Sequence, residues 1–229
     1  NAGTSKIATN LNTDYNNFSK LLRKLKEKKI KLVVVGPEEP LVNGLVNFLN
    51  KNKIKAFGPN KFAAKLEGSK SFMKKICRDY KIPTAKFKIC KNFKELNRSI
   101  KNFSFPVVIK ADGLAAGKGV TICESKKQVL EVSSEIFSGK FKGSNKLVIE
   151  EFLDGEEASY FLVVDKKNFI NFGSAQDHKK VGENETGPNT GGMGAYSPAP
   201  IINKILEKKI LKKIVLPTLK ALKDRKEFY

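Results

Sequence analysis

The chain has 229 residues, enough for one large domain or for two or three small ones. Apolar residues make up 40% and charged residues 29%, so the chain can bury a core and lacks the composition of a disordered protein. Its longest aliphatic run, residues 32–35, is too short to cross a bilayer, and we expect no membrane partner. The sequence starts with Asn1, without Met or a signal-peptide pattern, and we expect that the natural chain begins earlier.

The sequence carries 44 Lys and Arg against 23 Asp and Glu, a net charge of +21. Such a charge favours either a polyanionic partner, nucleic acid above all, or a lysine-rich surface without function. The lysines are spread along helix-like stretches such as 20–31 and are not interleaved with aromatic residues, so we favour the second reading and expect no nucleic-acid partner.

The three cysteines form no CxxC pair, which argues against a disulfide framework or a zinc knuckle. Free thiols suit a reducing compartment, and we expect a cytoplasmic protein.

The first 66 residues predict alternating helices and strands. A helical period is followed by a buried strand at 31–35, a second helix through Leu41, Leu45 and Leu49, and a short strand at 56–57; the first helix carries Phe18, Leu21, Leu22 and Leu25 on one face. This alternation is typical of part of a doubly wound parallel sheet.

From residue 69 onward the elements follow a different order. Ser69 is a candidate N-cap for a helix with Phe72, Ile76 and Tyr80 on one face. An extended segment (85–90), strands (107–110, 120–123, 147–150, 160–164, 169–172) and a helix (126–137) follow. Residues 176–200 are expected to form a long polar loop, and the chain ends in a basic helix from 202 with a kink or break at Pro217.

A loop with three glycines lies between two predicted strands, at residues 112–119. Glycines let main-chain N–H groups approach phosphate oxygens, and Lys110 and Lys118 add positive charge. The spacing does not fit a Walker A loop, since Gly119 stands where Ser or Thr is needed and a strand follows. An ordinary hairpin turn with solvated lysines remains the alternative.

Two further segments favour a nucleotide. Residues 67–70 open a helix, whose N-terminus attracts anions, although a capped helix start alone explains them. Residues 150–157 join two strands and offer main-chain groups, an apolar side chain and carboxylates to a base and a ribose, although a surface acidic turn is an equal alternative.

The order of these segments resembles the nucleotide site of the ATP-grasp family. Within that family the chain looks like the phosphoribosylamine–glycine ligases (glycinamide ribonucleotide synthetases), through residues 35–41, 57–59 and 176–179 and above all through TGPNTGGMGAYSP at 186–198. The resemblance covers nearly the whole chain. It implies α/β and α+β architecture: a partial Rossmann-like domain with a connecting helix at 1–88, an ATP-grasp lid at 89–157 and a truncated central ATP-grasp subdomain at 158–229.

The resemblance also assigns roles to single residues. Lys70 and Lys110 would hold ATP phosphates, with Lys110 near adenine, and a flexible flap would consist of Ala115, Ala116, Gly117, Lys118 and Gly119. Glu150 and Leu153 would meet adenine through their main chain, Phe152 would line its pocket and Glu157 would bind the ribose hydroxyls. The substrate side would be lined by Asp177, Lys179, Pro188, Asn189, Thr190 and Gly191.

The implied reaction is ATP-dependent ligation of glycine to 5-phosphoribosylamine through glycyl phosphate, giving glycinamide ribonucleotide, ADP and phosphate in purine biosynthesis. It needs positioning and charge neutralisation by lysines, N–H groups and Mg²⁺ or Mn²⁺, but no covalent protein nucleophile. We expect a monomer.

The sequence departs from the family at both ends. The carboxylates that hold magnesium in the family are expected after Tyr229, so no metal ligand is assigned in this chain. A glycine-rich strand and loop would precede Asn1, and we expect no ligase activity from the 229 residues alone. The alternatives are another ATP-grasp carboxylate–amine ligase, which would lack the string at 186–198, and a basic nucleic-acid-binding module, which would bind in a salt-sensitive manner.

Overall fold

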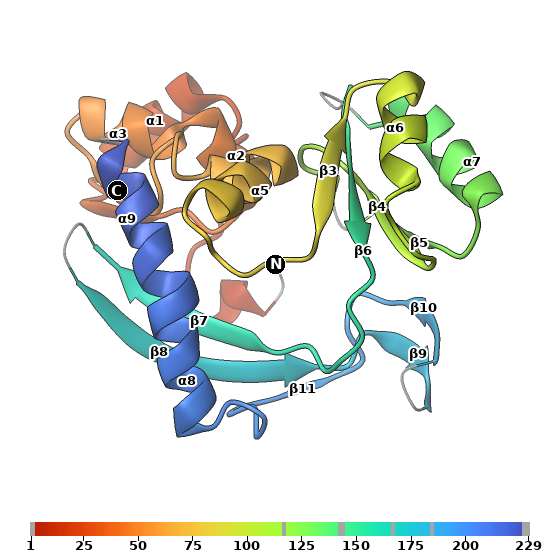
Figure 1. Ribbon diagram of the computed structural model, residues 1–229. Helices are drawn as coiled ribbons and strands as arrows, with labels where there is room; N and C mark the ends of the chain where they lie inside the picture. The colour runs from red at the N-terminus through yellow and green to blue at the C-terminus, as the bar shows by residue number, and fades with distance from the viewer. Residues whose placement is uncertain (1–2, 116–117, 142–144, 166–167, 184–185, 226–229) are drawn as a thin grey trace. The chain divides into compact units, whose positions relative to one another are not determined.

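The computed structural model describes residues 3–115, 118–141, 145–165, 168–183 and 186–225. The chain forms two compact units, Asn1–Gly68 and Ser69–Phe228, which we describe one at a time (Figure 1). Within the described residues, no helix has both the length and the apolar character needed to span a membrane.

The first unit alternates helices with two short parallel strands. Its elements are η1 (Thr4–Lys6), α1 (Phe18–Glu27), β1 (Leu32–Val34), α2 (Glu38–Asn43), α3 (Leu45–Lys51), β2 (Lys55–Phe57) and α4 (Lys65–Gly68). The parallel pairing of β1 with β2, with Val33 opposite Ala56, confirms the predicted topology. Its core consists of Leu21, Leu25, Val35, Leu45, Val46, Leu49 and Ile54.

Two expectations for this unit were wrong in detail. The single helix expected through Leu41, Leu45 and Leu49 is two helices, because Gly44 adopts a left-handed conformation with φ of 94° and ends α2. The strand β1 is not buried on both faces. Val33 packs on the core, whereas the alternating neighbours Leu32 and Val34 are 57% and 67% exposed.

The second unit begins with α5 (Lys70–Asp79) and a four-stranded antiparallel sheet in the order β3-β6-β4-β5. The strands are β3 (Phe87–Cys90), β4 (Val107–Ala111), β5 (Val120–Cys123) and β6 (Leu147–Glu151). Helices α6 (Phe93–Ile100) and α7 (Lys126–Phe137) cover one face of the sheet, and α5 lies on the other side of β6 (Figure 1). Helix α6 was not expected from the sequence.

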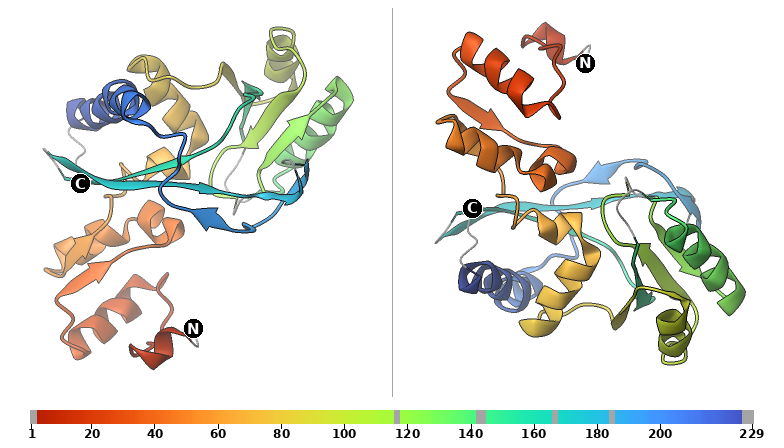
Figure 2. Two further views of the ribbon diagram at one scale, coloured as in Figure 1. Left: turned by 90° about the horizontal axis from the view of Figure 1, so that it is seen from below. Right: turned by 90° about the horizontal axis from the view of Figure 1, so that it is seen from above.

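The rest of the second unit is built on a long hairpin of β7 (Ser159–Val164) and β8 (Phe169–Asp177), which two further views show side by side (Figure 2). The expectation of a long loop at 176–200 was wrong. This segment contains a hairpin of β9 (Lys180–Gly182) and β10 (Thr186–Asn189) and the strand β11 (Ala195–Tyr196), which pairs with β8. Short strands of Gly, Pro and polar residues carry no hydropathy alternation from which they could be predicted.

The chain ends in a helical segment formed by α8 (Lys204–Ile210), a π-helical stretch (Leu211–Val215) and α9 (Leu216–Asp224). Pro217 lies in the first turn of α9, directly after the π-helical stretch, so the kink or break expected there takes the form of a local change of helix type within a continuous helical segment.

Candidate functional site

Strand alternation places Lys110 of β4 and Glu150 of β6 on the face of the sheet that looks toward α5. Glu150 lies opposite Val108, and Lys110 lies opposite Val148, so the two long side chains are diagonal neighbours. The Lys110 Nζ donates to Glu150 Oε2 at 3.0 Å. The structure therefore brings together two residues that the sequence analysis assigned to a nucleotide.

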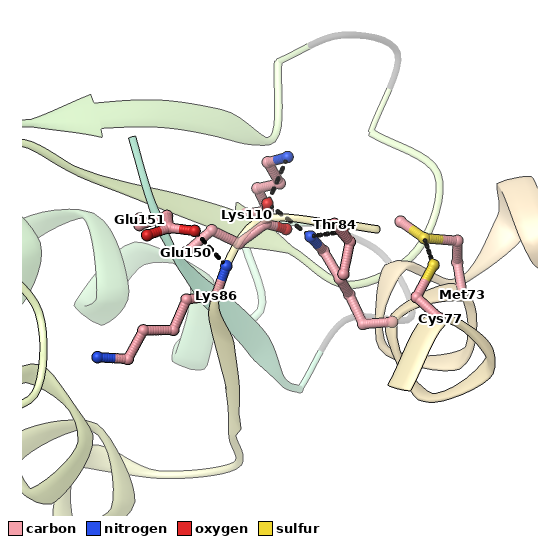
Figure 3. A network of polar contacts seen from close by, with 8 residues as sticks. Met73, Cys77, Thr84, Lys86, Lys110, Glu150 and Glu151 are labelled. Carbon is pink, nitrogen blue, oxygen red and sulfur yellow. Dashed lines mark hydrogen bonds and ion pairs between the residues drawn. The ribbon is translucent and has the colours of Figure 1, made fainter. Parts of the chain in front are cut away.

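A third charged residue, Lys74 of α5, completes this cluster and was missed in the sequence. Its side chain is only 3% exposed, and its Nζ lies 2.9 Å from the same Glu150 Oε2. It also donates to the Thr84 hydroxyl at 2.6 Å (Figure 3). On the helix face expected at Phe72, Ile76 and Tyr80, Ile76 is buried and the other two are half-buried; the fully buried residues of α5 are Ser71, Lys74, Ile76 and Cys77.

The second carboxylate oxygen of Glu150, Oε1, is not used by either lysine. Glu150 Oε1 is buried and has no hydrogen-bond partner among the described residues. Because β6 is paired with β3 on one side and β4 on the other, the main chain of Glu150 lies within the sheet. The group that Glu150 can offer to a ligand is thus its carboxylate, an acceptor for a donor that the described chain does not supply.

The start of the glycine-rich loop is fastened to the start of α5 by Asp112, which the sequence analysis did not single out. Asp112 accepts hydrogen bonds from the Ser71 N–H (3.0 Å) and hydroxyl (2.6 Å) and from the Ser69 hydroxyl (3.1 Å). Burial raises the pKa of Asp112, but the hydrogen bonds from Ser71, Ser69 and Gly113 outweigh it, so the pKa is lowered overall.

Lys70 adds a further contact between the same two segments. Its Nζ donates to the Gly113 carbonyl at 2.9 Å, while Ser69 caps α5 by accepting from the Phe72 N–H at 3.2 Å, which confirms the predicted N-cap. The lysine expected to hold phosphate thus lies at a helix N-terminus beside the glycine-rich loop.

The described part of the expected flap closes back onto β4. The Ala111 N–H donates to the Gly119 carbonyl at 2.8 Å. A Cβ at Gly119 would lie 2.6 Å from the Cβ of Ala115, so this close approach requires glycine. Lys118 is exposed, whereas Ala116 and Gly117 lie outside the described residues.

The segment after β6 leaves the sheet with two exposed apolar side chains, Phe152 (39%) and Leu153 (64%). Its start is fixed by a reciprocal pair of hydrogen bonds. The Lys86 N–H donates to Glu151 Oε1 at 2.7 Å, and the Glu151 N–H donates to the Lys86 carbonyl at 3.0 Å (Figure 3). Phe152 and Leu153, which were expected at adenine, therefore follow a strand end that is fixed by hydrogen bonds.

The expected ribose ligand and the expected substrate side meet at Lys179. Its Nζ lies 3.0 Å from Glu157 and 3.4 Å from Asp177, and the hydrogen bond to Glu157 raises the pKa of Lys179. Thr190 donates to the Lys179 carbonyl through its N–H (2.6 Å) and its hydroxyl (2.9 Å). Gly191 is exposed, and nothing is described of the side chains of Pro188 and Asn189.

Two kinds of site are not formed by these residues. Within the described parts of the chain, no group of three or more His, Cys, Asp or Glu residues could hold a metal ion. A surface groove of about 650 Å³ along residues 77–89 is lined by neither Lys110 nor Glu150. The buried polar cluster is the better candidate for a site, because burying two ammonium groups on one carboxylate oxygen is costly, whereas an open groove costs nothing comparable.

In chemical terms, the arrangement offers several cations, a helix N-terminus and a glycine-rich loop on one side and a buried acceptor oxygen beside them. Such a site suits a polyanion attached to a group that donates hydrogen bonds.

Comparison with known proteins agrees with this geometry. The family model described as "Phosphoribosylglycinamide synthetase, ATP-grasp (A) domain" matches residues 68–229, and the corresponding N-domain model matches residues 1–67. A phosphoribosylamine–glycine ligase from Arabidopsis thaliana, described as chloroplastic, is 52% identical over 195 residues, which are 84% of this chain and 37% of the relative. The ligase of Agrobacterium fabrum is 44% identical and covers 100% of this chain, which spans 54% of it.

Among solved structures, a phosphoribosylamine–glycine ligase from Thermotoga maritima superposes with a TM-score of 0.83 at 37% identity. The match covers 100% of this chain and 55% of that one. The fold expected from the sequence, a Rossmann-like N domain followed by an ATP-grasp domain, is thereby confirmed. The chain spans about half the length of the relatives that it matches over its whole length.

Proposed function

Because the chain belongs to the phosphoribosylglycinamide synthetase family, we propose that it supplies the nucleotide-binding part of an ATP-dependent ligase. The reaction joins glycine to 5-phosphoribosylamine through glycyl phosphate and gives glycinamide ribonucleotide, ADP and phosphate. The observation that carries the proposal is the cluster of Lys74, Lys110 and Glu150 beside a glycine-rich loop that is fastened to a helix N-terminus.

The residues present fit ATP. Lys70 and Lys110 would neutralise its phosphates, with the loop from Ala115 to Gly119 above them. The unpartnered oxygen of Glu150 would accept a hydrogen bond from the 6-amino group of adenine, a contact that the geometry favours over the main-chain contact expected from the sequence. Phe152 and Leu153 would flank the base, and Glu157 would accept from the ribose hydroxyls.

On the substrate side, Asp177, Lys179 and the turn at Thr190 would position glycine and phosphoribosylamine, joined by Pro188, Asn189 and Gly191. The task of these residues is to orient the glycine carboxylate toward the terminal phosphate and to offset the charge that develops during transfer. The described residues do not fit a divalent metal, so Mg²⁺ or Mn²⁺ is assigned no ligand here and no step depends on one.

Three coarser features complete the proposal. A division of the second unit near residue 157 suits the end of the four-stranded sheet at Glu151 and the start of the next sheet at Ser159. The three cysteines are free and buried, which suits a reducing cytoplasm. The protein would act as a monomer, without a nucleic-acid partner.

The test combines binding with turnover. The 229-residue chain should bind ATP in a titration calorimeter. A chimera in which it replaces the matching part of the Agrobacterium fabrum ligase, 44% identical over the whole chain, should release ADP only when both glycine and phosphoribosylamine are present. A folded chimera that binds ATP but releases no ADP under these conditions would reject the proposed reaction.

A further inference from the structure

A lysine with a side chain only 3% exposed is rare, because burying an ammonium group is costly unless it is paired. Lys74 is such a residue. It lies one helical turn after Lys70 on α5 and points to the sheet, where its hydrogen bond and ion pair go to Thr84 and Glu150 and not to the described part of the glycine-rich loop. It therefore has a role different from that of the lysines expected at phosphate.

Lys74 and Lys110 share one atom, the Oε2 of Glu150, at 2.9 Å and 3.0 Å. One carboxylate needs only one of these ammonium groups to balance its charge, so the cluster holds one cation more than it requires. The two lysines differ in exposure. The side chain of Lys74 is 3% exposed and that of Lys110 is 28% exposed, so only Lys110 can turn to a ligand without crossing the core.

Thr84 distinguishes the two lysines further. Its hydroxyl accepts from Lys74 Nζ at 2.6 Å, so this ammonium group has a second partner besides Glu150. The only ion pair or hydrogen bond described for the Lys110 ammonium is the one to Glu150. The Lys74 ammonium group also lies over the Phe87 ring, 5.5 Å from its centroid, so it is held by more partners than that of Lys110.

We propose that Lys74 is a positioning residue that stays on Glu150 as its permanent counter-ion, so that Lys110 is free to leave Glu150 for the nucleotide. This inference rests on the proposed nucleotide site and adds that Lys74 and Lys110, the two lysines that contact Glu150, have different roles. When Lys110 turns toward phosphate, Lys74 keeps its ion pair with Glu150 Oε2, so the carboxylate stays fixed in place.

The consequence is a choice between purines. With Oε2 held by Lys74, Glu150 presents Oε1 as an acceptor. A 6-amino purine donates to it, whereas the 6-oxo group of inosine or guanosine nucleotides places an acceptor against an acceptor. Lys74 therefore contributes to the preference for adenine without touching the base.

The experiment measures binding of ATP and ITP to the 229-residue chain by titration calorimetry. The wild-type chain is expected to prefer ATP by about tenfold or more, the size of discrimination that an unpaired polar group produces. Lys74→Met keeps the length of the side chain but removes the charge, so nothing holds Glu150 Oε2 once Lys110 turns to the phosphate, and Oε1 is no longer fixed toward the base. The ATP:ITP ratio should therefore fall to within about threefold of one. Lys74→Arg should retain most of the preference.

Lys75→Met is the matched control, because Lys75 lies on the exposed side of the same helix, and it should leave both affinities unchanged. A purely structural role for Lys74 would lower both affinities by the same factor, and an unchanged ratio in a folded Lys74→Met chain would overturn the inference. A wild-type chain that binds neither nucleotide would instead reject the proposed nucleotide site itself.

A second measurement uses the wild-type chain and does not depend on how the variants fold. Amine acetylation followed by mass spectrometry should leave Lys74 unmodified with and without ATP, whereas the labelling of Lys110 should fall when ATP is added. Labelling of Lys74 that rises on addition of ATP would mean that it leaves Glu150, and would overturn its role as the permanent counter-ion.

Discussion

The Ser71 hydroxyl donates a 2.6 Å hydrogen bond to Asp112 Oδ2, and the N–H of the same serine donates to Oδ1 at 3.0 Å. These bonds join the first turn of α5 to the start of the glycine-rich loop, 41 residues later in the chain. A carboxylate that accepts several hydrogen bonds at once fixes both segments, so Asp112 anchors the start of the loop.

Asp112→Ala should therefore destabilise the chain and loosen the loop together. We expect the free energy of unfolding to fall by about 2 kcal/mol, since a half-buried charged acceptor is removed and its donors lose their partner. Urea unfolding gives the free energy, and hydrogen exchange at Gly113 and Leu114 reports the loop. Faster exchange without any loss of stability would contradict the assignment of Asp112 as a structural anchor.

The same carboxylate predicts how stability depends on pH. The folded-state pKa of Asp112 is lowered from the ordinary value of 3.8, so its contribution is present above about pH 4 and is lost as the pH falls through the lowered value. Asp112→Asn removes this dependence. The difference in unfolding free energy between wild type and Asp112→Asn should shrink as the pH falls from 6 to about 3. A constant difference would mean that the Asp112 carboxylate does not contribute to stability in this way.

Gly44 predicts a stability effect within the first unit. Its φ of 94° separates α2 from α3, and a Cβ there would lie 3.1 Å from Lys61 Cδ. Gly44→Ala should cost about 1–2 kcal/mol of unfolding free energy. Gly36→Ala is the control, because a Cβ at Gly36 meets no atom within 4 Å, and it should have a far smaller effect.

These glycines also show what could be read from the sequence. Apolar patterns predicted α1 and three of the four strands of the larger sheet, β3 being expected only as an extended segment, and residue type predicted the Ser69 cap. These features follow from local residue choice. The same periodicity predicted one helix where the structure has α2 and α3, because Leu41, Leu45 and Leu49 keep a helical period across Gly44 whatever the φ of the glycine.

The candidate site was predicted unevenly for a similar reason. Lys110 and Glu150 were found through motif resemblance, whereas Lys74 and Asp112 were missed, because a charged residue in a helix or loop is normally assigned to the surface. Their burial depends on partners 76 and 41 residues away, Glu150 and Ser71 respectively, and no local pattern encodes such a pairing. The sequence signal that could have identified Lys74 is a lysine on the buried side of an amphipathic helix.

The buried cluster predicts strong coupling between Lys74 and Glu150. Glu150→Leu leaves two ammonium groups beside each other with no counter-ion, and Lys74 cannot reach water, so we expect a loss of about 3–5 kcal/mol. The double variant Lys74→Met, Glu150→Leu should lose less than the sum of the single changes by at least about 1 kcal/mol. Additive losses in urea unfolding would mean that the pair does not interact.

Tyr160 connects the β7–β8 hairpin to α8 through Glu207. Its hydroxyl donates to Glu207 Oε1 at 2.8 Å, and desolvation together with this bond raises the pKa of Tyr160 to about 12. Since the folded-state pKa is raised, the contribution to stability is present below about pH 10 and is lost as the pH rises toward 12. In a titration at 295 nm, Glu207→Gln should bring one tyrosine back toward pH 10, and identical curves would contradict the bond.

The pairing of Glu157 with Lys179 at 3.0 Å gives the sharpest test of the ribose contact. Both side chains are exposed, so the ion pair itself contributes little to stability and Glu157 can exchange it for the ribose hydroxyls. Glu157→Gln should weaken ATP binding by about fivefold, close to 1 kcal/mol, and should leave the binding of 2′,3′-dideoxy-ATP unchanged. Glu156→Gln makes the same change of charge one residue earlier, where the carboxylate accepts from Gln176, and should affect neither nucleotide. If Glu157→Gln weakens both nucleotides equally in the calorimeter, its effect is one of general charge and the ribose assignment is wrong.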